Sequence, residues 1–303
     1  MVVVFGSINL DLVARVARIP APGETLVGES FQTVPGGKGA NQALAARRAG
    51  AEVAMFGAVG RDAFAAQALV GLADAGVDLV GVRAVDAPTG VAIVSVADDG
   101  ENAITVIAGA NALSRAGDVP DTYLRQGNTL VMQLEVPLPE VAWLASRARK
   151  HGARVVLNAA PASRLPVALL ANVDVLIANE NEGTALAASL LMPASPEAFA
   201  AAFAAQYGAS AVVTLGARGA LTIAAGRLLR FVPPSVDVVD TTGAGDALVG
   251  ALAAALDRGQ PLAAALREGV AAGALACTRH GAQPGLPDAV SVRAAAMRVR
   301  FSD

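Results

Sequence analysis

One segment of the chain places a carboxylate directly after a glycine-containing turn. It reads Asp-Thr-Thr-Gly-Ala-Gly-Asp over residues 240–246 and leads into an apolar helical run. The N–H groups of Gly243, Ala244 and Gly245 would point at one spot where the helix dipole favours an anion, which predicts a phosphate-sized anion hole. Asp246 beside that hole could accept a hydroxyl proton, so the predicted chemistry is phosphoryl transfer. For an arbitrary Gly-x-Gly-Asp a plain helix cap is the commoner explanation, and this segment alone does not decide.

A second glycine-rich segment, Pro35-Gly-Gly-Lys-Gly-Ala-Asn41, also leads into a predicted helix. Its glycines permit the backbone to approach a ligand closely, while Lys38 and Asn41 add donors suited to hydroxyl or phosphate oxygens. A P-loop is excluded because Gly39 stands where Ser or Thr would ligate magnesium, and no Gly-x-Gly-x-x-Gly follows the first expected strand. The alternative is an ordinary glycine-rich helix entry.

Further polar side chains follow the expected strands. Asn9 and Asp11 come after the first strand, two residues apart, and would share one face of an extended backbone, which suits a polyol. Glu135 ends the run Met-Gln-Leu-Glu, and Asn-Glu-Asn-Glu occupies residues 179–182. Each of these is more often a cap or a solvated loop residue. Their shared position at the carboxyl ends of strands predicts a ligand site in an open α/β sheet.

The elements that must hold these residues can be read from the alternation of β-branched runs with alanine- and leucine-rich stretches. The alternation predicts an α/β fold, a doubly wound and mostly parallel sheet with helices on both faces, in a single domain over residues 1–303. Prolines mark three helix starts, at Pro139, Pro196 and Pro261. The expected strands are Val2–Phe5, Val53–Val59, Thr129–Leu134, Arg154–Leu157, Asp174–Ile177 and Ala211–Leu215.

Two regions break this alternation, at about residues 10–35 and 90–109. The second predicts a hairpin, with strands Val91–Ala97 and Ala103–Ile107 joined by Asp-Asp-Gly. Because such strands cannot enter a parallel sheet through short connections, they predict a small accessory β-sheet, a lid over a cleft. Its exposed strands could pair with those of a second chain, so a homodimer through the lid is expected.

Composition narrows the possible functions. The chain has 303 residues, a formal net charge of −3, 4% aromatic residues and no basic run, which argues against nucleic acid as a partner. Its apolar runs are shorter than the ~18 residues of a membrane span, and the start lacks a signal-peptide pattern, so a cytoplasmic protein with no membrane partner is expected. With two histidines and one cysteine, Cys277, a transition-metal site is not expected, and the cysteine is expected to be a small buried side chain.

The two glycine-rich segments resemble the signatures of the ribokinase-like, or PfkB-type, family of carbohydrate kinases, and the resemblance extends over essentially the whole chain. The motifs at 6–11, 22–25, 132–135 and 281–284 are similar to the branch of the family that acts on ribose. The resemblance implies ATP-dependent phosphorylation of D-ribose at O5, with Asp246 as the base and Gly243–Gly245 stabilising the developing charge. It implies that the sugar is held by Asn9, Asp11, Gly37, Lys38, Asn41, Glu135 and Asp246.

The same resemblance implies a nucleotide site and two metal sites. Glu182 would orient Mg²⁺ through water, and a monovalent cation, K⁺, would lie near the anion hole. The sequence departs from the family at Gly285, where relatives can carry serine, and at Val270, where a histidine can contact the adenine. The implied nucleotide contacts are Asn179, Thr214, Gly216, Arg218, Gly219, Gly245 and Val270, and the implied cation-site residues are Asp240, Thr242, Ala276, Arg279, Gly281 and Gly285.

Two other functions stay open at this point. The acceptor could be a nucleoside or another sugar, such as fructose or a keto-deoxy acid, although the low aromatic content gives little material for a nucleoside pocket. The chain could also be a catalytically silent protein that binds a sugar or a nucleotide. The presence of Asp246 speaks against this, because a silent homologue needs no base there.

Overall fold

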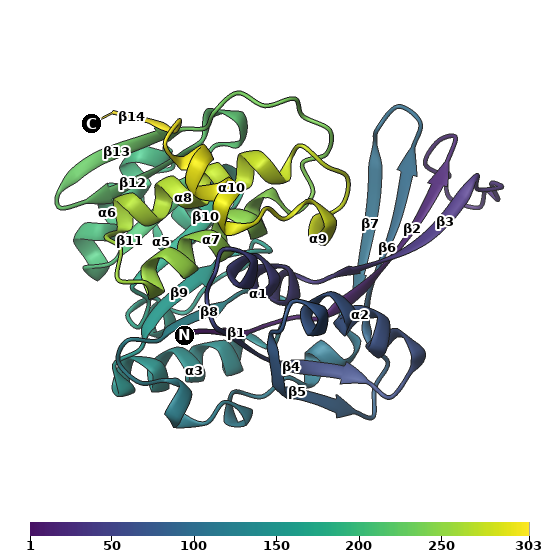
Figure 1. Ribbon diagram of the computed structural model, residues 1–303, viewed down its shortest axis with the longest axis horizontal. Coiled ribbons are helices and arrows are strands. Elements are labelled where there is room, and N and C mark those ends of the chain that lie inside the picture. Colours follow the sequence, from purple (N-terminus) through teal and green to yellow (C-terminus); the bar gives the residue numbers. More distant parts are fainter. Residues whose placement is uncertain (303) are drawn as a thin grey trace.

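A ten-stranded sheet forms the centre of the computed structural model, which describes residues 1–302 (Figure 1). The strand order is β14-β13-β12-β11-β10-β9-β8-β1-β4-β5, parallel from β11 to β5 and antiparallel from β11 to β14. The strands are β1 (Val2–Phe5), β4 (Val53–Gly60), β5 (Asp78–Val85), β8 (Thr129–Met132), β9 (Arg154–Asn158), β10 (Val175–Asn179), β11 (Ser210–Thr214), β12 (Ala220–Ala224), β13 (Arg227–Val232) and β14 (Arg300–Ser302).

Helices cover both faces of this sheet, as the sequence predicted. Alternate residues of β1 enter different cores: Val2 and Val4 pack in one, Val3 and Phe5 in the other. The first core is closed by α1 (Lys38–Arg48), α2 (Ala63–Asp74), α7 (Ala244–Asp257), α8 (Leu262–Ala276) and α10 (Ala289–Ala296). The second is closed by α3 (Leu138–His151), α4 (Val167–Leu170), α5 (Glu180–Leu190) and α6 (Pro196–Tyr207). The remaining helical segments are η1 (Gly109–Leu113), η2 (Ala116–Asp118), η3 (Asp121–Tyr123), η4 (Gly216–Arg218) and α9 (Ala282–Gly285).

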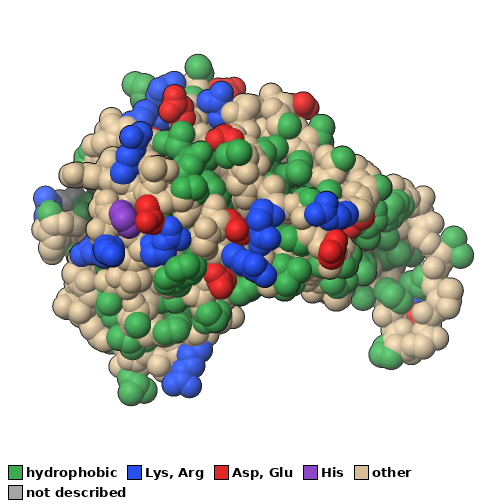
Figure 2. All heavy atoms as spheres, turned by 90° about the horizontal axis from the view of Figure 1, so that it is seen from below, with side chains coloured by type: hydrophobic (Ala, Val, Ile, Leu, Met, Phe, Trp, Pro, Cys, Tyr) green, Lys and Arg blue, Asp and Glu red, His purple; other side chains and the backbone are tan. Residues whose placement is uncertain are grey.

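A separate four-stranded sheet forms the predicted accessory layer, called the lid below. Its order is β3 (Ser30–Gly36), β2 (Asn9–Val16), β6 (Gly90–Ala97) and β7 (Asn102–Ile107). The lid projects from the body of the molecule (Figure 1). Seen from below that view, acidic and basic side chains are interspersed over the body, whereas the projecting arm shows few charges (Figure 2).

Two element boundaries matter for the site, and one of them differs from the expected one. The strand expected to reach Leu134 ends at Met132, because the Leu134 N–H leaves the sheet ladder and donates to the Ala160 carbonyl at 2.9 Å. Helix α7 begins at Ala244, so Asp246 lies inside its first turn.

Within residues 1–302, no helix combines the length and the apolar character needed to cross a membrane.

Candidate active site

The turn before α7 has a shape that its neighbours fix. Gly243 caps the helix at φ +78°, and a Cβ atom there would lie 2.8 Å from Cα of Ala282. The Asp240 carboxylate fixes the turn through three hydrogen bonds. Its Oδ1 accepts from the N–H of Thr242 at 2.9 Å and from the Thr242 hydroxyl at 2.7 Å. Its Oδ2 accepts from the Gly281 N–H at 2.8 Å. Burial opposes the charge, but these hydrogen bonds hold the pKa of Asp240 below its usual range. The first turn of α7 is therefore presented in one conformation, as an anion hole requires.

Asp246 is buried in the first turn of α7, with 8% of its surface exposed. Its Oδ2 accepts from Nδ2 of Asn41 and its Oδ1 from Nε2 of Gln42, both at 2.9 Å. Burial, the largest influence, raises the pKa of Asp246, whereas the positive charge of Lys38 and the two amide donors favour the carboxylate. Asp246 is thus a buried carboxylate whose two oxygens are both oriented, which suits a general base.

The groups predicted to hold a sugar surround this carboxylate. Asp11 has its pKa raised to about 7, first by burial and then by the nearby charges of Glu135 and Asp246. Oε2 of Glu135 accepts from the N–H of Lys38 at 3.0 Å. Asn41 donates to Asp246, and its own Oδ1 is buried with no hydrogen-bond partner in the described chain. Together with Asn9 at the start of β2 and Gly37 at the N-cap of α1, these residues gather acceptors for hydroxyl groups in one place.

Several side chains of this site were missed from the sequence. Asn111 fixes Asn9, because its Nδ2 donates to Oδ1 of Asn9 at 2.7 Å while its Oδ1 accepts from the Ile8 N–H at 2.8 Å. Ser7 donates to Oε2 of Glu135 at 2.6 Å. No spacing in the sequence links these pairs, which lie 102 and 128 residues apart. For Gln42 there was one signal, since it follows Asn41 directly in a glycine-rich motif.

A cavity of about 510 Å³ is lined in part by Thr241, Ala244 and Gly245 of the anion turn. Thr214, Gly216, Gly219, Gly245 and Val270, five of the predicted nucleotide residues, line it. No sequence motif indicated its largely apolar remaining wall, which includes Pro233, Pro234, Val236, Val238, Leu248 and Cys277. Cys277, expected to be buried, is only partly buried there and donates to the Gly273 carbonyl at 3.3 Å.

Two predicted nucleotide residues are engaged elsewhere and are not among the lining residues of this cavity. Asn179 caps α5, where its Oδ1 accepts from the Glu182 N–H at 2.8 Å. Arg218 forms an ion pair with Glu180 at 2.5 Å. Both remain near the cavity, because Asn179 pairs with Thr214 in the sheet and Arg218 lies between two lining glycines. Their contact with a nucleotide stays a prediction.

Glu182, the residue predicted to orient magnesium through water, lies in the first turn of α5 and forms its capping box with Asn179. Its Oε2 accepts from the Asn179 N–H at 2.8 Å, and burial, as the main cause, raises its pKa. Lys38 and Asp246 also influence this pKa, so Glu182 faces the same region as the base. No group of three His, Cys, Asp or Glu side chains in residues 1–302 could hold a metal unaided. A single carboxylate fits magnesium that arrives with a phosphate and keeps most of its waters.

The predicted monovalent-cation residues also lie together. A Cβ atom at Gly285 would meet the carbonyl oxygens of Ala276 at 2.9 Å and Arg279 at 3.5 Å, so both oxygens lie close to this glycine. Asp240 bonds to the N–H groups of Thr242 and Gly281 and ties this loop to the anion turn. The donor set is oxygen throughout, which suits a hard cation.

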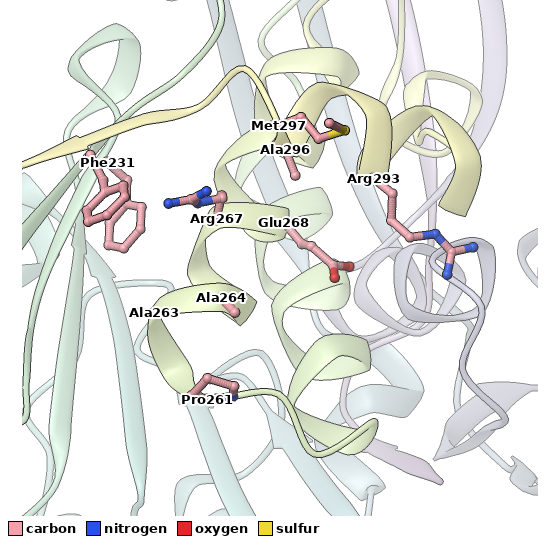
Figure 3. Close-up of a pocket in the computed structure, with 10 residues that line it drawn as sticks. Phe231, Pro261, Ala263, Ala264, Arg267, Glu268, Arg293, Ala296 and Met297 are labelled. Atoms are coloured by element: carbon pink, nitrogen blue, oxygen red, sulfur yellow. The ribbon is translucent and has the colours of Figure 1, made fainter.

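A second cavity, of about 490 Å³, lies between α8, α10 and the β13–β14 edge (Figure 3). Its charged groups already have partners. The Arg267 guanidinium lies 4.6 Å from the centre of the Phe301 ring, Glu268 pairs with Arg258 at 2.6 Å, and Arg293 donates to the Ala289 carbonyl at 3.1 Å. We therefore assign the chemistry to the site around Asp246.

Comparison with known proteins gives a consistent result. The model of the pfkB family carbohydrate kinases matches residues 1–289. A ribokinase of Haemophilus influenzae is 37% identical over 288 residues, which are 94% of each chain. The crystal structure of a ribokinase from Thermotoga maritima superposes with a TM-score of 0.90 at 30% identity, covering 98% of this chain and 99% of the other. The structure of Arabidopsis thaliana ribokinase complexed with ribose and ATP gives 0.87 at 32% identity, covering 97% and 98%.

Proposed function

The chain belongs to the pfkB family of carbohydrate kinases, and from this membership we propose that it is a ribokinase that phosphorylates D-ribose at O5 with ATP. The observation that carries the proposal is the position of Asp246. Its carboxylate is buried, oriented by two amides, and placed in the same helical turn as the glycine-flanked anion hole. A base and an anion hole so close together serve a reaction in which a hydroxyl loses its proton as a phosphoryl group is held.

The reaction follows from these positions. The O5 hydroxyl of ribose gives its proton to Asp246 while the oxygen forms a bond to the γ-phosphorus of ATP. The bond from that phosphorus to the β,γ-bridging oxygen breaks, and ADP leaves with the electron pair. Backbone N–H groups at Gly243 and Gly245 stabilise the charge on the phosphoryl oxygens. The N–H of Ala244, predicted to join them, instead donates to the Thr241 carbonyl at 3.2 Å and closes the turn. Magnesium, when bound with ATP beside Glu182, supplies further neutralisation of that charge.

The acceptor groups around Asp246 support a pentose as the substrate. Asp11 and Glu135 accept from ring hydroxyls, and the unpartnered Oδ1 of Asn41 accepts another hydroxyl hydrogen. A site whose buried polar atoms are satisfied only by a correctly placed hydroxyl discriminates strongly against sugars that lack it. ATP occupies the 510 Å³ cavity, with its base against the apolar wall and its phosphates toward Gly245.

The direct test is an acceptor panel. We expect purified protein with ATP and magnesium to phosphorylate D-ribose with a higher kcat/KM than fructose, a keto-deoxy acid, 2-deoxyribose or a nucleoside, measured by coupled ADP release. Much faster turnover of another acceptor would show a kinase of the same family with a different substrate. Binding of ribose and ATP without turnover of any acceptor would show a silent binding protein.

Potassium activation also belongs to this proposal, supported by the carbonyls of Ala276 and Arg279 that converge near Gly285. A bound cation would stiffen the loop that Asp240 ties to the anion turn. We expect kcat to fall when potassium is replaced by tetramethylammonium at equal ionic strength. An unchanged kcat would mean that this protein, with glycine at position 285, has no functional potassium site.

A homodimer through the lid is supported by apolar side chains on the lid surface. Ile104 and Val106 of β7 are 57% and 52% exposed, and strand register places them on the same lid face as Asp11. A second lid packed on this face would bury them and cover the sugar site. Light scattering should give twice the chain mass, and a protein that is monomeric at assay concentrations would contradict the dimer.

A further inference from the structure

Three buried amides form a hydrogen-bonded chain that ends on Asp246. Gln133 Nε2 donates to Gln42 Oε1 at 2.7 Å, and Gln42 Nε2 donates to both Asp246 Oδ1 and Asn158 Oδ1 at 2.9 Å. Asn158 Nδ2 donates in turn to the Ile177 carbonyl at 3.2 Å. Gln42 and Gln133 are fully buried, and Asn158 is 8% exposed.

The direction of every bond in this chain is set by one main-chain group. The Ile177 carbonyl can only accept, so the nitrogen of Asn158 must face it and its oxygen must face Gln42. Gln42 must then present its nitrogen to that oxygen and to Asp246, and its own oxygen to Gln133. A reversed Gln42 amide would place its oxygen against two other oxygens, so the donor is locked toward the carboxylate.

We infer that Gln42 is a positioning residue that keeps Asp246 ionised and aimed at the acceptor hydroxyl, with Asn158 fixing the polarity of its amide and Gln133 donating to its oxygen. This inference rests on the proposed function, in which Asp246 is the base. A buried carboxylate without charge-assisted donors is protonated more readily. Asn41 supplies one donor but also faces the sugar site, whereas Gln42 is held entirely within the protein.

Two substitutions at Gln42 distinguish the effect of its amide donor from the effect of its side-chain packing. In Gln42→Leu the donor is lost, and we expect the acid limb of the kcat/KM profile to move up by about one pH unit. Gln42→Glu keeps the shape but puts an acceptor against Asp246, so the two carboxyl groups share a proton and the limb should move by about two units or more. If Gln42 only fills space, the isosteric Gln42→Glu protein would instead be closer to wild type than the leucine variant.

The control is the equally buried Gln283, whose amide has no hydrogen-bond partner among the residues described. Gln283→Leu should leave the acid limb where it is. A second readout needs no turnover: the ¹³C shift of the Asp246 carboxyl, followed by NMR during a pH titration, should report a higher pKa in both Gln42 variants. An unmoved Asp246 pKa in a folded Gln42→Leu protein would overturn the inference, whereas a wild-type protein with no kinase activity would overturn the proposed function alone.

Discussion

Replacing Asp246 by asparagine should lower kcat about 10²-fold or more while ribose and ATP still bind. The variant keeps the size of the side chain but cannot take up the hydroxyl proton. Its amide nitrogen must also face either Asn41 or Gln42, both of which donate to position 246 in the native protein. Some stability should therefore be lost, because one donor is left facing another donor.

The measurement is kcat for ribose together with the dissociation constants of ribose and ATP from calorimetry. The matched control is Asp257→Asn at the other end of α7, where the carboxylate pairs with the N-terminal amine at 2.8 Å. That change should lower the melting temperature slightly and leave kcat near wild type. Near-normal turnover of the Asp246→Asn protein would remove the base from the mechanism.

Gly243→Ala should cost about 10²-fold in kcat, the loss seen when one donor of an oxyanion hole is removed. The new Cβ would lie 2.8 Å from Cα of Ala282, a main-chain contact that can be relieved only by moving the turn. Its backbone conformation, at φ +78°, adds strain for a residue with a side chain. Moved N–H groups would no longer converge on the phosphoryl oxygens.

Gly259, just beyond the C-terminus of α7, offers a control variant that tests backbone strain without displacement of neighbouring atoms. It has nearly the same conformation, φ +79°, but no atom of the described chain would lie within 4 Å of a Cβ atom placed there. Gly259→Ala should lower the free energy of unfolding by about 1 kcal/mol and leave kcat near wild type. Equal losses of kcat in the two variants would mean that the turn conformation at Gly243 has no special role.

Local patterns were enough to predict six of the ten strands of the main sheet, the presence of helices on both its faces, and the lid. Pro139 marked the start of α3, and Asp-Asp-Gly marked the β6–β7 hairpin, because these residues favour particular backbone conformations whatever their surroundings. The edge strand β5 was not predicted. The short antiparallel strands β12 to β14 were also not predicted, since the expected alternation of strands and helices stops after β11.

The sequence predicted the site residues that follow a recognisable backbone turn. It did not predict the side chains that reach the site from distant parts of the chain. Asp246 follows a turn that can be recognised locally. Gln42 meets Asp246 across 204 residues, and nothing near either residue in the sequence specifies the contact. Which atom of each buried amide faces which partner depends on the folded network, whose direction is set by the Ile177 carbonyl.

Strand β2 begins at Asn9 beside the base and runs on to Val16 in the lid, so Asn9 and Asp11 belong to both parts of the molecule. Because a hydrogen-bonded strand is stiff along its length, a swing of the lid about its base must carry these two side chains with it. If Asn9 and Asp11 hold the sugar as proposed, binding of the sugar and movement of the lid would be mechanically coupled through this one strand.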